Sequence, residues 1–211
     1  MTNTYDRIAG IYDTLSRLVF GKSIVNAQLA LLPQISAPCK LLIVGGGTGW
    51  ILDELAKVHV SGLDISYVEI SAKMILLAKK RNVRQNKIHF IHMPIEDFES
   101  NETFDVVMTP FLFDNFAPER AEAVFLKLHK LLIVGGTWLF VDFHIENQIK
   151  GIWQKALLQC MYWFFKTVCN VEASTLPDME SHFQNKGYIV LDKSTHFQGF
   201  IQSIAYQKVT P

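Results

Sequence analysis

Residues 41–49 read Leu-Leu-Ile-Val-Gly-Gly-Gly-Thr-Gly, an apolar run that breaks directly into glycines. The apolar run predicts a buried strand of a parallel sheet, and the glycines predict a sharp turn into a helix. Gly45, Gly47 and Gly49 remove side chains where the backbone must turn tightly and approach a ligand closely. The stretch therefore predicts a turn that binds a nucleotide cofactor, with Gly46 inside it.

The residues after the glycines narrow the kind of cofactor. A dinucleotide fingerprint needs its third glycine where Trp50 stands, which disfavours a nicotinamide oxidoreductase, and no Gly-Lys-Ser/Thr ending of a phosphate loop follows. A second apolar run, residues 58–63, leads to Asp64 and Ile65. A carboxylate at such a strand end can accept hydrogen bonds from two ribose hydroxyls. A ribose-bearing ligand without a pyrophosphate fits best.

Strand-like and helical patterns alternate along the chain. Strands are expected at residues 40–44, 58–63, 88–91, 104–108 and 137–142, and helices at 51–56, 66–81 and 118–131. Two last strands, at 188–194 and 201–209, follow a helix near 178–186. This alternation predicts one α/β domain over residues 1–211, a doubly wound and mostly parallel sheet whose ligands bind at the carboxyl ends of its strands.

Several motifs resemble the class I S-adenosylmethionine-dependent methyltransferases. Residues 41–49 are similar to their glycine turn, and residues 5–13, Tyr-Asp-Arg-Ile-Ala-Gly-Ile-Tyr-Asp, resemble the N-terminal segment of the ubiquinone/menaquinone-biosynthesis type. Residues 104–107 and 131–142 are similar to the family's fourth and fifth strands. The resemblance implies a Rossmann-like sheet of seven strands with an antiparallel C-terminal strand. It also implies S-adenosyl-L-methionine as cofactor and S-adenosyl-L-homocysteine as product.

The same resemblance assigns roles to individual residues. The glycine turn would admit the methionine and ribose portions of the cofactor, Asp64 would hold the ribose, and Ile95 with Glu96 would flank the adenine. Thr109, at the end of the fourth strand, and Tyr12 in the N-terminal segment complete the expected cofactor set.

Two acids of the family pattern are replaced in this chain, by Ile43 in the first strand and by Pro94 after the third. Glu96 or Asp97 is expected to take the place of the second acid. The alternative is that both are solvated acids of a surface loop.

Methyl transfer is an in-line displacement, so the protein mainly aligns donor and acceptor and excludes water. Asp142 and His144, just past the fifth strand, are the candidate general bases, because histidine titrates near neutrality. The alternative is an ordinary polar strand end. The segment 111–116 carries three phenylalanines, which predict either an apolar pocket wall or core packing.

Two segments are expected to cover the site. Residues 1–36 form a helical lid in which Tyr5 and Tyr12 share one helix face. Residues 145–175 form a helical insertion or cover, with Lys155, Gln159, Tyr162 and Lys166 on one stripe of a helix from Ile152 to Val168 and apolar side chains, Trp163 among them, around the rest. For this second helix we expect core burial first, then a substrate lid, a homodimer face, or a shallow membrane contact.

The composition of the chain limits the kinds of partner that we expect. The chain has 211 residues, 49% of them hydrophobic, and zero formal net charge, which gives no reason to expect nucleic acid. Three scattered cysteines predict no disulfide framework or metal site, and they indicate a reducing compartment. No targeting signal or spanning segment is visible, so we expect a cytoplasmic enzyme acting on a small, apolar or aromatic acceptor. The alternative is a non-catalytic S-adenosylmethionine-binding or regulatory protein on the same fold.

Overall fold

The computed structural model describes residues 5–145 and 152–210. One seven-stranded sheet has the order β3-β2-β1-β4-β5-β7-β6. Its strands are β1 Cys39–Val44, β2 Leu63–Glu69, β3 Lys87–His92, β4 Phe104–Pro110, β5 Leu132–Phe143, β6 Ile189–His196 and β7 Ile201–Gln207. Strands β1 to β5 pair in parallel, whereas β7 runs antiparallel to β5 and β6. The predicted Rossmann-like sheet with an antiparallel C-terminal strand is confirmed.

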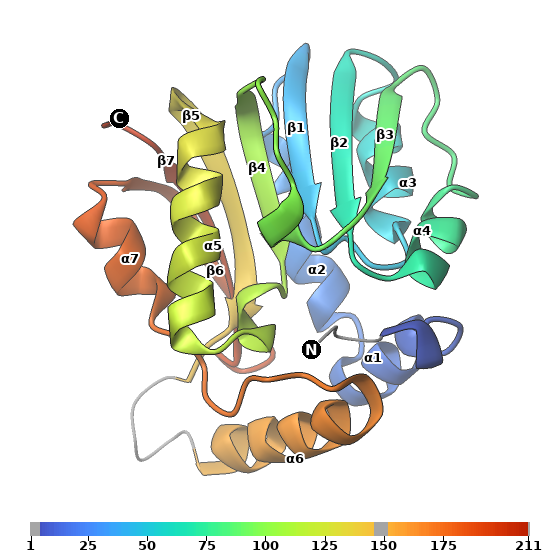
Figure 1. Cartoon of the computed structure of the whole chain (residues 1–211), viewed down its shortest axis with the longest axis vertical. Helices are drawn as coiled ribbons and strands as arrows, with labels where there is room; N and C mark the ends of the chain where they lie inside the picture. Colours follow the sequence, from blue (N-terminus) through green and yellow to red (C-terminus); the bar gives the residue numbers. More distant parts are fainter. Residues whose placement is uncertain (1–4, 146–151, 211) are drawn as a thin grey trace.

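Helices cover both faces of this sheet (Figure 1). They are α1 Tyr12–Phe20, α2 Ser23–Leu29, α3 Trp50–Val58, α4 Ala72–Ala78, α5 Pro118–Leu131, α6 Ile152–Cys169 and α7 Met179–Asn185. Short 3-10 turns are η1 Tyr5–Arg7, η2 Leu32–Gln34, η3 Ile95–Asp97 and η4 Phe113–Asn115. Helices α5 and α7 lie on one face, and α2 and α3 lie on the other. None of the described helices combines the length and the apolar content needed to cross a membrane.

Strand β1 is an interior strand of the sheet, between β2 and β4, and its side chains belong to the hydrophobic cores on both faces. Leu41 and Ile43 belong to the core under α2 and α3, and Leu42 and Val44 belong to the core under α5 and α7. Successive side chains of a strand point to opposite faces, and a strand buried on both faces reads as a continuous apolar run. Ile43 is fully buried in this arrangement. It packs among apolar side chains, where an unpaired carboxylate would be costly to bury.

Strand β2 lies later in the sequence than the second predicted strand. It begins at Leu63, where the expected strand 58–63 ended, and it continues to Glu69. Gly62, with φ of 95°, lies in the turn that leads into β2. The expected helix 66–81 starts correspondingly later, because Ser71 caps α4 by accepting a hydrogen bond from the Met74 N–H.

The sheet changes direction between β1 and β4, which are neighbours, so the turns after these two strands open a crevice at the carboxyl edge. Helices α1 and α6 lie at this carboxyl edge, away from the amino ends of the parallel strands (Figure 1). Residues 146–151 of the expected cover 145–175 fall outside the described part of the chain.

Helix α6 departs in part from the predicted pattern. Its inner side carries Leu158, Tyr162 and Cys169, which are buried. Tyr162, expected beside the two lysines of a polar stripe, faces inward instead. Trp163, expected on the apolar side, is exposed. The stripe of Lys155, Gln159 and Lys166 faces solvent as predicted.

Candidate active site

A cavity of about 380 Å³ lies at the carboxyl edge of the sheet. Glycines 45–47 after β1, Glu69 at the end of β2, and Ile95 with Glu96 in η3 form one part of its lining. Much of the rest comes from α1, α6, Phe143 at the end of β5, and the end of β4 with its following turn: Pro110, Phe111, Leu112, Asp114, Asn115 and Phe116. The structure therefore brings the carboxyl ends of five strands, β1 to β5, and both covering helices to one cavity.

The glycine turn is shaped by its neighbours. The Tyr67 hydroxyl donates a hydrogen bond to the Gly47 carbonyl at 3.0 Å, and a Cβ on Gly46 would lie only 2.4 Å from that hydroxyl. Gly47 has φ of 61° and open space where its side chain would be, so it leaves a cradle that a Cβ would fill. Gly49 serves another purpose, since it is the N-cap of α3 and lies close to Ala78, outside the cavity lining.

Glu69 is the carboxylate that β2 presents to the cavity. One oxygen accepts a hydrogen bond from the Gly47 N–H at 3.0 Å, and the other accepts one from the Ser71 N–H at 2.9 Å. Burial raises the pKa of Glu69, and these backbone donors oppose the rise. Each oxygen keeps a further lone pair that can accept from a ligand hydroxyl.

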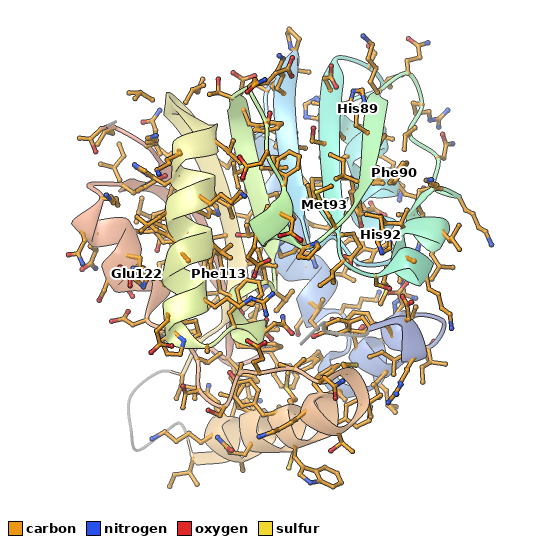
Figure 2. All side chains as sticks on the ribbon, viewed as in Figure 1. His89, Phe90, His92, Met93, Phe113 and Glu122 are labelled. Carbon is orange, nitrogen blue, oxygen red and sulfur yellow. The ribbon has the colours of Figure 1, made fainter. Side chains whose placement is uncertain are left out.

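Asp64, expected to hold the ribose, lies at the other end of β2. Its side chain pairs with exposed His89 at 2.9 Å, and Figure 2 shows His89 toward the opposite end of β3 from Met93, which lines the cavity. Ile65 is buried in the core. The assignment of Asp64 and Ile65 to the carboxyl edge was therefore wrong. The signal that finds Glu69 is the apolar run ending there, followed by the Ser71 helix cap.

The segment after β3 borders the same cavity. Pro94, Ile95 and Glu96 line it, whereas Asp97 is exposed and lies outside the lining. One Glu96 carboxylate oxygen, Oε1, accepts a hydrogen bond from the Arg120 guanidinium. The other, Oε2, is buried and has no hydrogen-bond partner among the described residues. A buried acceptor without a donor is costly, so Oε2 marks a place where a ligand donor fits.

The N-terminal segment is attached to the turns that follow β1 and β2. The Thr48 hydroxyl donates to the Asp13 carboxylate, with oxygen distances of 3.0 and 2.8 Å. The Asp6 carboxylate accepts from the Ser71 hydroxyl and from the Lys73 N–H. These bonds give the two aspartates of the motif at residues 5–13 a structural role, and they place Tyr12 in the cavity lining.

Asp114, like Glu69, lines the cavity without having been predicted from the sequence. It lies in η4, lines the cavity, and accepts a hydrogen bond from the Asn115 side-chain amide at 2.7 Å. Burial raises the pKa of Asp114 well above its ordinary value, and the charge of nearby Asp142 adds to the rise. Tyr5 donates a hydrogen bond to the Asn115 side-chain oxygen, so the N-terminal segment also contacts this turn.

The expected bases lie elsewhere. The Asp142 carboxylate accepts hydrogen bonds from the N–H groups of Phe113, Asp114 and Phe143, at 3.1, 3.3 and 2.8 Å. With His144 it lines a different cavity of about 340 Å³. Neither side chain lines the cavity at the glycine turn. Asp142 orients the η4 turn that carries Asp114, since two of its donors are backbone groups of that turn.

Thr109 is not part of the cavity lining either. It is fully buried, and its hydroxyl accepts a hydrogen bond from the Trp138 indole at 2.9 Å. Of the nearby phenylalanines, Phe111 and Phe116 line the cavity, whereas Phe113 packs in the core beside α5, where Figure 2 labels it. The predicted pocket wall is thus built by two of these three rings.

Comparison with known proteins shows what the chain is similar to. Residues 41–136 match the family described as "Methyltransferase domain". The ubiquinone/menaquinone biosynthesis C-methyltransferase UbiE of Rhodopseudomonas palustris is 25% identical over 153 residues, which is 68% of this chain. The chain spans 59% of the length of that curated relative.

Two solved structures share the fold. N-methyltransferase NodS of Bradyrhizobium japonicum, in complex with S-adenosylhomocysteine, has a TM-score of 0.67 at 14% identity, covering 88% of this chain and 86% of its own. The 1,6-didemethyltoxoflavin-N1-methyltransferase of Burkholderia thailandensis has a TM-score of 0.66 at 12% identity, with coverage of 97% and 86%. By its sheet and its glycine turn, the chain has the fold of the class I S-adenosylmethionine-dependent methyltransferases, and residues 41–136 match their domain. Among curated proteins it is similar to the UbiE type.

The cavity fits S-adenosylmethionine in three independent respects. Glu69 offers a carboxylate for the ribose, the unpartnered Glu96 Oε2 offers an acceptor for the adenine amino group, and the cradle at Gly47 leaves room beside the backbone. Ile95 and Glu96 both line this cavity, and their place at the adenine stays a prediction. Glu96 thus offers a carboxylate near Pro94, which replaces one acid of the family pattern.

Proposed function

We propose that this chain transfers the methyl group of S-adenosylmethionine to a small, apolar or aromatic acceptor. The observation that carries the proposal is the continuity of one cavity, which runs from the glycine turn to apolar side chains of α1 and α6. A cavity of about 380 Å³ is in the range of small-molecule sites.

Side chains from three parts of the chain, β2, η3 and α1, would hold the cofactor. When bound, it supplies an electrophilic methyl group on a sulfonium. The Glu69 carboxylate would accept hydrogen bonds from the ribose hydroxyls while the Gly47 and Ser71 N–H groups keep it in place. Glu96 Oε2 would accept from the adenine amino group, and Ile95 would pack on the ring. Asp13, held by Thr48, would provide a negative charge near the methionine end, where Ile43 provides none.

The acceptor half of the cavity is apolar. Its wall consists of aromatic and aliphatic side chains from α1, the β4 turn, the end of β5, and α6: Phe20, Phe111, Phe143, Leu157, Met161, Phe164 and Phe165. Such a wall favours an apolar or aromatic molecule, because burial of apolar surface is the main source of its binding energy. It also excludes water from the reacting atoms.

Asp114 is the candidate general base of this site, in place of Asp142 and His144. It touches the cavity, and its raised pKa brings the carboxylate closer to the neutral range that suits proton transfer. It would accept the proton that an acceptor O–H or activated C–H loses as the new bond to the methyl carbon forms. Asp142 is a positioning residue, since it holds the N–H groups of the turn.

The test is turnover with methyl-labelled S-adenosylmethionine and a panel of phenols and hydroquinones. We expect label in an organic-soluble product and one S-adenosylhomocysteine released for each methyl group transferred. Binding of the cofactor without release of S-adenosylhomocysteine on any acceptor would support the non-catalytic alternative. Transfer to RNA, DNA or protein alone would contradict the proposed acceptor class.

A further inference from the structure

The most exposed large apolar side chains gather on the two helices that cover the cavity. Among the described residues, the three highest exposed fractions are those of Leu18 on α1, at 82%, and of Trp163 and Ile152 on α6, at 74% and 71%. None of the three lines the cavity. They therefore need an explanation other than acceptor binding. We call the solvent-facing side of α1 and α6 the covering face.

The exposed charged side chains of the covering face are all basic. The exposed charged residues of α1 and α6 are Arg17, Lys155 and Lys166, and α6 has no acidic residue in its eighteen positions. The one acid of α1, Asp13, is half-buried and bonded to Thr48. The whole chain has zero net charge, so this face is a local excess of positive charge.

On α6, helix geometry places the exposed apolar and basic side chains next to each other. Ile152, Ala156 and Trp163 are spaced by four and seven residues, which is one stripe of a helix, and Lys155 and Lys166 lie beside that stripe. Leu158 and Tyr162 occupy the opposite, buried side. Apolar and tryptophan side chains flanked by lysines are typical of a helix lying in a lipid interface, where the lysine stems reach the headgroups.

The covering face also contains the opening of the cavity. Val19 of α1 and Cys160 of α6 are both exposed and both line the cavity, so the opening lies between these helices. Figure 1 shows α1 and α6 at the same edge of the molecule. A surface that covered this face would adjoin the entrance to the apolar acceptor wall.

We propose that the covering face docks on an anionic lipid surface, with Leu18, Ile152 and Trp163 in the interface and the basic side chains at the headgroups. A second copy fits less well, because a symmetric contact on this face would bring like charges together. Entry of an apolar acceptor from the lipid follows from this placement, and that step rests on the proposed function. The docking itself does not.

The test is flotation of the purified chain with vesicles, without cofactor or acceptor. We expect binding to phosphatidylcholine vesicles that contain phosphatidylglycerol, weaker binding to phosphatidylcholine alone, and loss of binding at high salt. Leu18→Glu and Trp163→Glu are expected to abolish flotation. Lys155→Gln and Lys166→Gln are each expected to weaken it roughly five-fold. Thermal melting of every variant checks that it is folded.

Val60→Glu is the matched control. Val60 is 55% exposed and precedes β2, at the sheet edge opposite the cavity, so its change should leave flotation intact. Absence of wild-type flotation, or equal loss in Val60→Glu, would overturn the proposal. A wild-type dimer in solution that Trp163→Glu dissociates, with no vesicle binding, would assign the face to a second copy instead. Because flotation needs no turnover, an inactive protein that floats would contradict only the proposed function.

Discussion

The Glu69 carboxylate accepts a hydrogen bond from the Gly47 N–H at 3.0 Å, so the acid that ends β2 is joined to the glycine turn that follows β1. The two groups that a ribose would meet therefore hold each other in place before any ligand arrives. Such preorganisation reduces the ordering cost of binding. It also means that a change at either residue acts on one shared structure.

Glu69→Gln should weaken S-adenosylhomocysteine binding by about 1.5–3 kcal/mol, the usual contribution of hydrogen bonds to a charged group. Asp64→Asn is the matched control, since Asp64 lies at the far end of the same strand, and its affinity should equal that of the wild type. Isothermal titration calorimetry measures both. Equal affinities in the two variants would remove Glu69 from the cofactor site.

Gly47→Val should prevent cofactor binding, because a branched side chain would enter the cavity and φ of 61° is strained for any residue with a Cβ. Gly21→Val separates the effect of backbone strain from the effect of filling the cavity. Gly21 has φ of 59°, also with open space around it, but lies outside the cavity lining. We expect similar losses in melting temperature and a loss of affinity only at Gly47. A folded Gly47→Val protein with wild-type affinity would contradict the assignment of the turn.

Asp114→Asn should lower kcat by about 10²–10⁴-fold if Asp114 is the base. Burial and the charge of Asp142 raise the Asp114 pKa, so its carboxylate forms at higher pH than an ordinary aspartate. Wild-type turnover should therefore rise with pH above the ordinary carboxyl range, and the variant should lose that rise. The measurement is a pH profile of kcat with S-adenosylhomocysteine affinity as the control. Full turnover in the variant would show that no base is needed at this position.

Much of the fold could be predicted because the glycine turn follows a strand buried on both faces. The apolar run of β1 and the alternation of elements after it reflect physical requirements that are local in sequence. The failure at β2 has an equally physical cause. Two apolar runs, each ending in an acid, occur in succession at residues 58–64 and 65–69. Only the pairing of Leu63 with Cys39 in the sheet decides which acid reaches the carboxyl edge.

The arrangement of Asp142 and Asp114 could not be predicted for a different reason. Asp142 was singled out by its position at a strand end, but the direction of its side chain depends on the pleat and on the N–H groups that it meets. Asp114 lies in a short 3-10 turn among phenylalanines, a context with no periodic signal. Its role becomes visible only when the turn after β4, the N-terminal segment and α6 are placed around one cavity.

The attachment of Asp6 should make the N-terminal segment sensitive to acid. Hydrogen bonds from the Ser71 hydroxyl and the Lys73 N–H lower the pKa of Asp6. Its contribution to stability is present above the pKa of an unfolded aspartate and is lost as the pH falls through the lower folded pKa. Asp6→Asn should therefore increase proteolytic cleavage within residues 5–20 at neutral pH. Asp178→Asn, which removes an equivalent cap at α7, should leave that cleavage unchanged.

Substitution of two aromatic residues of α6 can show whether this helix covers the acceptor or has only a structural role. Phe164 lines the cavity, whereas Trp153 lies outside the lining and packs against Phe197 and Phe200, with ring centroids 5.8 and 5.9 Å apart. Phe164→Ala should reduce turnover on an apolar acceptor, mainly through KM, and leave S-adenosylhomocysteine affinity unchanged. Trp153→Ala should instead lower the free energy of unfolding by roughly 1–3 kcal/mol, with near-normal KM in the protein that remains folded.

Thermal melts, calorimetry and steady-state kinetics on both variants decide between these roles. Because the proposed cofactor site is built by the ends of β1, β2 and β3, neither change removes a group that would contact the cofactor there. Loss of cofactor affinity in folded Phe164→Ala would mean that α6 closes over the cofactor rather than the acceptor. Equal destabilisation by both changes, with unchanged KM in Phe164→Ala, would make α6 a purely structural element.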